Sequence, residues 1–264
     1  MKRYFAGIDA GSTYIKVALL DQGKQLAGSD VGYTGIDAAG TARRLISGLC
    51  GQVGIDPADV AGIIATGYSR RNMDAAHDTV TEIQAHARGA AWSAPDGVQI
   101  RTVVDIGGQD SKVIVLDDSG NVANFIMNDK CAAGTGRFLE SLARALEISI
   151  EELGPVSLES SQPATINSTC VVFAESEVIS LVARNKRRED IAAGIHASLA
   201  ARIGGMSRHA GITPEILLTG GGGLNCGIAR ALEDEMQADI HLPRYPQLNG
   251  AIGAALIALE RDGD

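Results

Sequence analysis

Apolar and polar positions alternate along two stretches of the chain, in short runs separated by turn residues, which is the pattern of β-strands. The clearest runs are residues 4–8, 15–20, 102–104 and 113–116. In each stretch a third strand-like run follows a turn, Gln22-Gly23 in the first and Asp118-Ser119-Gly120 in the second. Strands joined by such short turns are antiparallel, so the pattern predicts two three-stranded meanders.

Helical spacing of apolar residues dominates the segments that follow each meander. The predicted helices are residues 38–50, 80–92, 136–146, 173–183, 191–209, 229–236 and 250–260, and the predicted buried strands are residues 60–65 and 215–218. A chain of 264 residues has room for two small domains. We therefore predict two α/β domains, the first formed by residues 1–97 with 247–264 and the second by residues 98–246.

The two meanders are related in sequence as well as in pattern. Residues 9–21 and 105–117 align without a gap at an offset of 96, and six of the thirteen positions are identical. The matches are Asp9/Asp105, Gly11/Gly107, Lys16/Lys112, Val17/Val113, Leu20/Leu116 and Asp21/Asp117. Because both the chemistry and the flanking runs agree, the match indicates a duplication rather than a chance similarity between two glycine turns.

Glycine is frequent, with 32 residues and no collagen-like period, which places it in turns and ligand-binding loops. The turns after Asp9 and Asp105 expose successive backbone N–H groups that can bind phosphate oxygens. A carboxylate at the end of the preceding strand can hold Mg²⁺ through water. Neither a P-loop nor a complete Gly-x-Gly-x-x-Gly pattern occurs. The two related loops therefore predict a nucleotide held between two facing domains.

A third glycine loop, residues 219–223, follows a predicted buried strand and opens a helix. Its four consecutive glycines let a flat ring approach the backbone, which suits the nucleoside end of a nucleotide. The alternative is a plain connection between strand and helix.

Two Asp-x-Gly loops, this late glycine loop and a terminal Asn249-Gly-Ala-Ile-Gly253 helix together resemble the actin, hexokinase and heat-shock-chaperone ATPase superfamily. The resemblance covers the whole chain, with the motifs in the same order. It implies a duplicated actin-like, ribonuclease-H-like α/β fold with two domains around a nucleotide cleft. It also implies ATP or ADP and Mg²⁺ as cofactors.

The same resemblance implies a role for individual residues. Asp9 and Asp105 would serve Mg²⁺ and water, and Gln109 would act with them in catalysis. Lys16 would either approach a phosphate oxygen or lie as a surface lysine on its strand. The nucleotide-binding positions would be Gly11, Ser12, Thr13, Lys16, Gly107, Gly108, Gly134, Gly136, Gly220, Gly221, Gly222, Gly223 and Asn249.

The chain has four cysteines and no Cys-x-x-Cys motif, which excludes a zinc ribbon or a thioredoxin motif. Cys50 falls in a predicted helix, and Cys226 is placed in the helix that follows the third glycine loop; at both we expect buried small apolar residues. Cys131 and Cys170 each precede a predicted helix, and Ser168 or Thr169 would cap the second one. A helix N-terminus lowers the pKa of a thiol and favours an anionic centre. The residues alone leave open a redox or metal role for Cys131 and Cys170, or two packed cysteines.

Three longer strings are more specific: residues 105–112, residues 127–139 around Cys131, and residues 168–180 around Cys170. They resemble the ATP-dependent activators of 2-hydroxyacyl-CoA dehydratases, and equally the ATPase subunits of benzoyl-CoA reductases. The resemblance implies a homodimer with one [4Fe–4S] cluster held by Cys131 and Cys170 of each subunit. It implies ferredoxin or flavodoxin as electron donor and an iron–sulfur dehydratase or reductase as partner.

Two other classes share the superfamily, namely small-molecule kinases and actin-like structural proteins. Kinases generally insert substrate-binding segments, and the predicted elements leave little chain for one. In a structural protein the cysteine strings would have no role. The sequence therefore favours an ATP-hydrolysing electron-transfer activator, with the ATPase subunit of a reductase as the alternative.

Charge and composition limit the partners. The chain has 23 Lys and Arg against 32 Asp and Glu, a net charge of −9, and only 4% aromatic residues. Such a chain repels nucleic-acid phosphates and anionic lipid. The short basic cluster from Arg184 to Arg188 is interpreted as a solvated helix connection. No signal segment and no run of 18 apolar residues occurs, so we predict a cytoplasmic protein that binds neither nucleic acid nor membrane.

Overall fold

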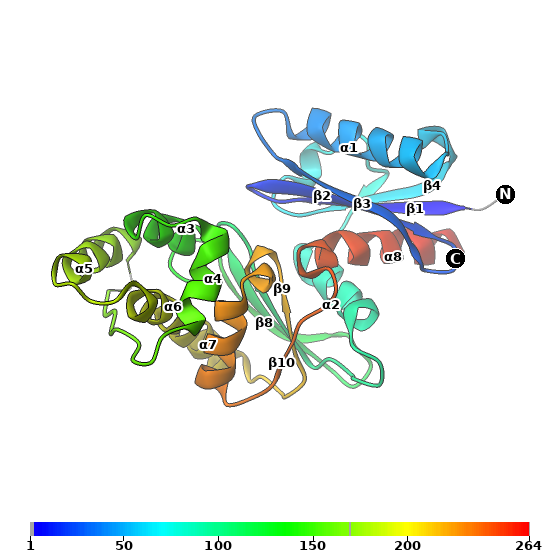
Figure 1. Cartoon of the computed structure of the whole chain (residues 1–264). Helices are drawn as coiled ribbons and strands as arrows, with labels where there is room; N and C mark the ends of the chain where they lie inside the picture. Colours follow the sequence, from blue (N-terminus) through cyan, green and yellow to red (C-terminus); the bar gives the residue numbers. More distant parts are fainter. Residues whose placement is uncertain (1–2, 169, 264) are drawn as a thin grey trace. The chain divides into compact units, whose positions relative to one another are not determined.

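The computed structural model describes residues 3–168 and 170–263. They fall into two compact units. The first unit comprises the chain up to Gln99, the segment Leu116–Val122 and the chain from Gln247 onward. The second comprises Ile100–Val115 and Ala123–Pro246. Each unit contains a five-stranded sheet (Figure 1).

The sheet of the first unit has the strand order β3-β2-β1-β4-β5. Its strands are β1 (Tyr4–Ala10), β2 (Tyr14–Asp21), β3 (Leu26–Tyr33), β4 (Val60–Thr66) and β5 (Asp78–Thr79). The first three pair antiparallel, while β4 is parallel to β1 and β5 is parallel to β4. The central strand β1 is therefore buried along nearly its whole length.

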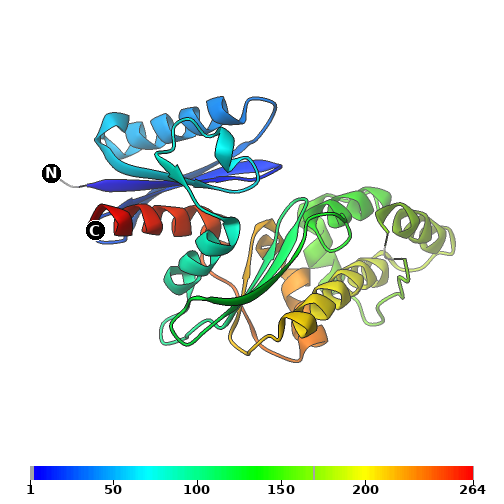
Figure 2. The same ribbon diagram turned by 180° about the vertical axis from the view of Figure 1, so that it is seen from behind.

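Helices cover both faces of this sheet, as Figures 1 and 2 show. Helix α1 (Ala38–Val53) packs on one face over a core that includes Ile8, Val17 and Leu49. Helices α2 (Glu82–Ser93) and α8 (Asn249–Gly263) pack on the other, over a smaller core with Phe5 and Ile64. The last helix of the chain thus belongs to the same unit as the first strand.

The contact between β1 and α8 depends on a glycine. A Cβ atom built on Gly7 would collide with the carbonyl oxygen of Ala251 and the backbone nitrogen of Ala255. The strand and the helix backbone therefore approach each other more closely than any other residue type would allow.

We expect Gly7→Ala to lower the free energy of unfolding by about 1–3 kcal/mol, the usual cost of overpacking a core. The matched control is Gly48→Ala in the exposed interior of α1, where a Cβ would meet nothing. That variant should gain about 0.5–1 kcal/mol, because alanine restricts the unfolded chain more than glycine does. Denaturant titration of both variants measures the difference, and equal midpoints would contradict this role of the Gly7 contact.

The sheet of the second unit repeats the first, with the order β10-β9-β6-β7-β8. Its strands are β6 (Thr102–Ile106), β7 (Ser111–Leu116), β8 (Val122–Asn128), β9 (Ile216–Thr219) and β10 (Ile240–His241). Strand β6 pairs antiparallel with β7 and parallel with β9, as β1 does with β2 and β4. The predicted α/β class and the duplicated meander are therefore confirmed.

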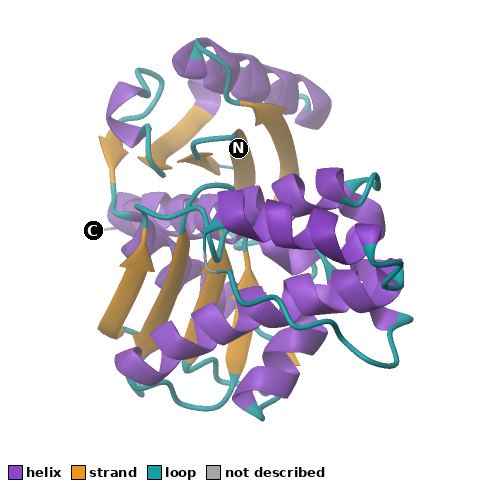
Figure 3. Cartoon of the chain, turned by 90° about the vertical axis from the view of Figure 1, so that its left-hand side faces the viewer, coloured by secondary structure: helices purple, strands orange, loops and turns teal. Residues whose placement is uncertain are grey.

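Five helices accompany this sheet (Figure 3). They are α3 (Gly136–Ala145), α4 (Ile150–Leu158), α5 (Val171–Ala183), α6 (Arg188–Ala210) and α7 (Cys226–Met236). One large core joins them to the strands and includes Phe138, Leu153 and Ile195. Short 3₁₀ turns lie at Pro57–Asp59, Arg70–Asn72, Gly221–Leu224 and Pro246–Leu248.

Some elements differ from the sequence-based expectation. Helix α2 begins at Glu82 rather than near Val80, because Thr81 and Gln84 form a capping box. Helix α4 was not predicted, since Pro155 interrupts its pattern, although Ser149 and Glu152 form a capping box there too. The strands β5 and β10 have two residues each, which is too short for a periodic signal. Among the described residues no helix is long and apolar enough to cross a membrane.

Candidate functional site

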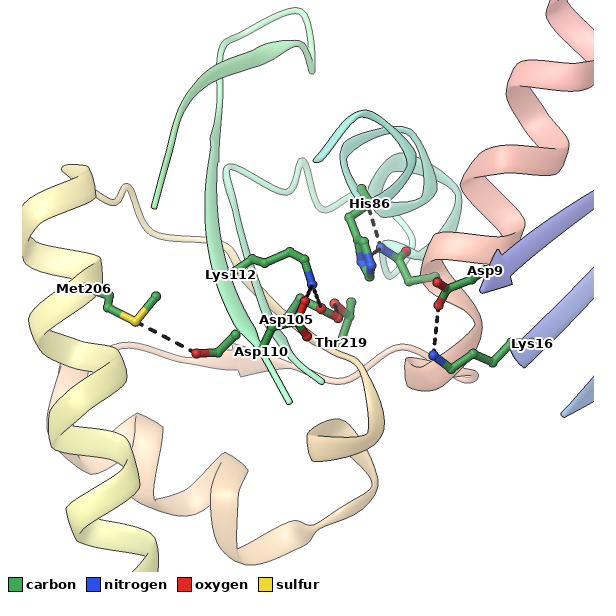
Figure 4. A network of polar contacts seen from close by, with 10 residues as sticks. Asp9, Lys16, His86, Asp105, Asp110, Lys112, Met206 and Thr219 are labelled. Atoms are coloured by element: carbon green, nitrogen blue, oxygen red, sulfur yellow. Dashed lines mark hydrogen bonds and ion pairs between the residues drawn. The ribbon is translucent and has the colours of Figure 1, made fainter. Parts of the chain in front are cut away.

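The first glycine turn lies between β1 and β2, at the end of a buried strand. Asp9 faces Lys16 in the strand register, and the Lys16 ammonium lies 3.0 Å from Asp9 Oδ2 (Figure 4). Thr34 closes the turn, since its hydroxyl donates to the carbonyl of Gly11 and its N–H donates to the carbonyl of Thr13. Within the described chain the buried Thr13 hydroxyl has no hydrogen-bond partner. That hydroxyl, with the half-buried Gly11-Ser12-Thr13 backbone, fits an anionic ligand.

The second glycine turn, between β6 and β7, repeats this arrangement in a more buried form. Lys112 faces Asp105 in the register and lies 3.2 Å from its Oδ2. The same ammonium lies 2.7 Å from Asp110 Oδ2, and the Thr219 hydroxyl donates to Asp105 Oδ1 at 2.9 Å (Figure 4). Lys112 is 2% exposed, so its charge is neutralised by carboxylates rather than by water. In the same turn Gly107 and Gly108 are half-buried and Gln109 is exposed.

The duplication extends to the parallel strand beside each aspartate. Thr66 on β4 is the register partner of Asp9, as Thr219 on β9 is of Asp105. A glycine with positive φ follows each threonine, Gly67 at +93° and Gly220 at +81°. Each unit thus holds one Asp–Lys–Thr set at the same place in its sheet.

Sequence reasoning did not identify Lys112, Asp110, Thr66 or Thr219 as site residues. The signal was present for three of them. Lys16 and Lys112 already matched in the repeat, and a Thr-Gly pair ends both parallel strands. Asp110 has no counterpart in the first turn, where Tyr14 stands at the aligned position.

The third glycine loop packs against the second turn within the same unit. A Cβ on Gly220 would collide with the carbonyl of Ile106 and lie 2.8 Å from Asp105 Oδ1, so only glycine fits. Gly222 and Gly223 are buried, while Gly221 is exposed. Asn225 then caps α7, its side-chain oxygen accepting from Gly227 N–H at 2.9 Å. The loop therefore places an open backbone edge beside the Asp105 carboxylate.

Two other predicted nucleotide-binding residues are held inside the first unit. Lys16 is half-buried in its pair with Asp9, which is not the exposed surface lysine that the sequence left as an alternative. Asn249 is fully buried at the start of α8. Its side-chain nitrogen donates to the carbonyl of His86 at 3.0 Å, and its oxygen accepts from Ser93. Asn249 therefore fastens α8 to α2.

The second glycine turn is bonded to the start of α3. The N–H of Gly136 donates to the carbonyl of Gly107 at 2.8 Å, and the N–H of Arg137 donates to the carbonyl of Gly108 at 2.9 Å. Gly134, with φ at +87°, lies under the side chain of Arg202 just before this helix. The first turn of α3 thus holds the glycine turn in place, and the segment that leads into α3 contains Cys131.

Cys131 lies in the turn between β8 and α3 and is half-exposed. The side-chain amide of Asn128 donates to the carbonyls of Cys131 at 2.8 Å and Ala133 at 3.0 Å, which fixes the turn. Behind the turn, α3 is bonded to α5 by the Ser141 hydroxyl and the Glu175 carboxylate, 3.1 Å apart.

Cys170 is exposed and is itself the N-cap residue of α5. The expectation that Ser168 caps this helix was wrong, because the helix begins later than that cap requires; Thr169, the other expected cap, lies outside the described residues. Among the described side chains none caps the helix by a hydrogen bond. The N–H groups of its first turn, directly after Cys170 in the chain, are therefore left without a side-chain cap among the described residues.

The segment before Cys170 is bound by a carboxylate of α5. Glu177 accepts from the N–H of Asn167 at 3.1 Å, from its side-chain amide at 3.2 Å and from the N–H of Ser168 at 3.0 Å. Burial raises the pKa of Glu177, but these bonds outweigh burial and lower it. Sequence reasoning did not identify Glu177 as a site residue.

The remaining cysteines separate into two kinds. Cys50 is buried in α1 as predicted, and burial together with the nearby Asp56 carboxylate raises the pKa of its thiol. The prediction for Cys226 was wrong, because its side chain is exposed. It is the first residue of α7, where the chain leaves the glycine loop, and not an interior residue of that helix. All four thiols are free.

The donor groups can be compared with the implied cofactors. The buried carboxylates of Asp9 and Asp105 at strand ends fit Mg²⁺ held through water. An iron–sulfur cluster takes four thiolates, and Cys131 and Cys170, the pair that the longer sequence strings single out, would supply two. Within residues 3–168 and 170–263 there is no group of three His, Cys, Asp or Glu side chains that could hold a metal. The residues of this chain therefore fit half of such a cluster.

The chain matches the model of the BadF/BadG/BcrA/BcrD ATPase family over residues 6–258. It is 42% identical over 257 residues to the 2-hydroxyisocaproyl-CoA dehydratase activator of Clostridioides difficile, covering 97% of this chain and 95% of that protein. It is 32% identical over 262 residues to a component of the benzoyl-CoA reductase of Thauera aromatica, covering 95% and 91%.

Comparison with solved structures finds relatives of the same kind. The activator of the 2-hydroxyisocaproyl-CoA dehydratase from Clostridium difficile, with bound ADPNP, superposes with a TM-score of 0.92 at 42% identity, covering 98% of this chain and 96% of that one. Component A of the Acidaminococcus fermentans (R)-2-hydroxyglutaryl-CoA dehydratase gives 0.93 at 40% identity, with 99% of both chains covered. A ROK-family glucokinase from Streptomyces griseus gives 0.58 at 15% identity, covering 97% and 99%, which shows a shared fold alone.

Proposed function

Because the chain belongs to the BadF/BadG/BcrA/BcrD ATPase family, we propose that it is an ATP-hydrolysing activator that passes a low-potential electron to a 2-hydroxyacyl-CoA dehydratase. The observation that carries the proposal is the bonding of the Asp105 glycine turn to the helix that follows Cys131. The first turn of α3 therefore connects a candidate phosphate-binding turn with the segment that carries a candidate cluster thiol.

The two Asp–Lys–Thr sets support the nucleotide half of the proposal. The glycine turns after Asp9 and Asp105 each bind phosphate oxygens of ATP or ADP, and residues 1–97 with 247–264 and residues 98–246 act as the two ATPase domains. Asp105, with Gln109, orients the attacking water, and both aspartates hold Mg²⁺ through water. The exposed backbone at Gly221 meets the nucleoside.

The thiols of Cys131 and Cys170 support the electron-transfer half of the proposal. Cys131 and Cys170 would supply two thiolates, and the same two residues of a second copy of the chain would complete the four that a [4Fe–4S] cluster takes, in a homodimer. When bound, that cluster accepts an electron from ferredoxin or flavodoxin and gives it to an iron–sulfur dehydratase. The substrate of the dehydratase then never contacts this chain.

Two alternatives make different use of these residues. In the ATPase subunit of a benzoyl-CoA-type reductase the second pair of thiolates comes from a non-identical chain. In a small-molecule kinase the two accessible cysteine segments and their hydrogen bonds have no task. The greater similarity to dehydratase activators favours the main proposal over both.

The coupling of ATP to the electron is testable by redox titration. We expect ATP, compared with nucleotide-free protein, to lower the midpoint potential of the cluster and to change the rate at which a chelator removes iron. A γ-phosphate that shifts the carbonyls of Gly107 and Gly108 also shifts Gly136 and Arg137, and with them the Cys131 turn. Solvent access and hydrogen bonds at the sulfurs set the potential.

The measurement compares anaerobic protein with no nucleotide, with ADP and with ATP. Reciprocity requires that reduction of the cluster changes ATP affinity by the same factor. Identical potentials and chelation rates in all three states would rule out the coupling, and would leave ATP only a role in docking the partner.

A further inference from the structure

The segment of residues 160–168, which leads to Cys170, forms no helix or strand, yet carboxylates accept hydrogen bonds from it at two places. At its start Asp190 of α6 accepts from the Ser160 hydroxyl at 2.8 Å and from Gln162 N–H at 3.3 Å. At its end Glu177 of α5 accepts from Asn167 and Ser168. The last of these bonded residues is two positions before the cysteine.

Helix geometry explains why Glu177 reaches this segment. It lies seven residues after Cys170, which is two turns, so both residues lie on the same face of the helix. Side chains on a helix lean toward its N-terminus, so the Glu177 carboxylate points back toward the start of α5. It accepts hydrogen bonds from two backbone N–H groups and one side-chain amide, all of them donors.

We infer that Glu177 is a positioning residue that holds the Cys170 thiol in the orientation the [4Fe–4S] cluster requires, an inference that rests on the proposed function. Outer residues that fix a metal ligand by hydrogen bonds commonly change metal affinity 10- to 100-fold when replaced. Glu177 acts on the backbone before the thiol rather than on the sulfur.

The same helix is also bonded to the helix that follows the other cysteine. Glu175, two positions before Glu177, accepts from Ser141 of α3, the helix that follows the Cys131 turn. Helix α5 thus fixes the approach to Cys170 through Glu177 and the helix after Cys131 through Glu175.

The test uses full-length protein purified anaerobically and loaded with iron and sulfide. Glu177→Gln keeps the size of the side chain but turns an acceptor-only group into one that presents N–H to the N–H donors of Asn167 and Ser168. We expect a chelator to remove iron about 10-fold faster than from wild type, with a shifted midpoint potential. Asn167→Ala removes only the side-chain amide donor and should give a smaller change in the same direction.

The matched control is Glu152→Gln. Glu152 accepts from a backbone N–H at the start of α4, in the same unit, and its pKa is likewise lowered, by the bonds to Ser149. That variant should keep the chelation rate and the potential of wild type. Equal melting temperatures of the Glu177 and Glu152 variants would separate a local effect on the cluster from a general loss of stability.

The outcomes separate a failure of the inference from a failure of the proposed function. If Glu177→Gln and Asn167→Ala both release iron at the wild-type rate and keep its potential, the positioning role is wrong although the cluster proposal stands. If Glu177→Gln fails to fold, Asn167→Ala alone tests the inference. A wild-type rate of iron release and a wild-type potential in that variant would overturn it. If wild-type protein binds no iron, or Cys170→Ser keeps its iron, the proposed function itself fails.

Discussion

Replacing either Cys131 or Cys170 with serine is expected to leave the protein without iron, while wild type holds about four iron atoms per dimer. The expectation follows from the donor count. In each chain Cys131 lies in the turn before α3 and Cys170 at the start of α5, in one unit, and among the described residues no group of three metal-binding side chains is found. Losing one thiol per chain removes two of the four thiolates, which a hard serine hydroxyl does not replace at neutral pH.

The other two cysteines provide matched controls. Cys50→Ala removes a buried thiol, and Cys226→Ala removes one that is exposed at the start of a helix, as Cys170 is. Both variants should keep full iron content. Cys226→Ala is the more stringent control, because it tests whether exposure and a position at the start of a helix are sufficient to make a thiol a cluster ligand.

Iron and sulfide analysis together with sedimentation measures this prediction. A cluster that survives Cys170→Ser would contradict the bridging arrangement. So would a full cluster on a strictly monomeric protein. A dimer that forms only with a different chain would favour the ATPase component of a reductase instead.

The sequence was most informative where local chemistry decides structure. The gap-free repeat predicted the paired meanders, and the register then places Asp9 opposite Lys16 and Asp105 opposite Lys112. The repeat implies that both hairpins share one register, but which residues face each other depends on the length of the turn, which the structure supplies.

Tertiary relations were less accessible. The bonds from Gly136 and Arg137 to the second glycine turn join residues about 29 positions apart and leave no periodic trace. Glu177 resembles any other helix carboxylate until its three donors are seen. The exposure of Cys226 depends on where α7 begins, and helix boundaries are set by caps such as Asn225 rather than by apolar spacing.

Asp105→Asn is expected to lower ATP turnover by about 10²-fold or more, the scale of losing one general-base or water-positioning group. The substitution keeps the shape of the side chain and removes its charge. In wild type Thr219 and Lys112 donate to the two carboxylate oxygens of Asp105. The amide nitrogen of the asparagine variant would therefore face a hydrogen-bond donor. Steady-state phosphate release measures the effect, and a wild-type rate would refute the catalytic role.

We expect the fold to survive Asp105→Asn, so that a loss of ATP turnover in this variant can be attributed to catalysis. Removing one partner of a buried ion pair usually costs several kcal/mol, because the other charge is left unpaired. Here Lys112 keeps Asp110, whose Oδ2 lies 2.7 Å from the ammonium, so its charge stays neutralised after Asp105→Asn. The control is Asp117→Asn in the exposed turn between β7 and β8, at the other end of β7, where the carboxylate accepts from Ser119 and Asn121 N–H. That variant should keep wild-type turnover, so a loss in both variants would indicate damage to the hairpin instead of a catalytic role for Asp105.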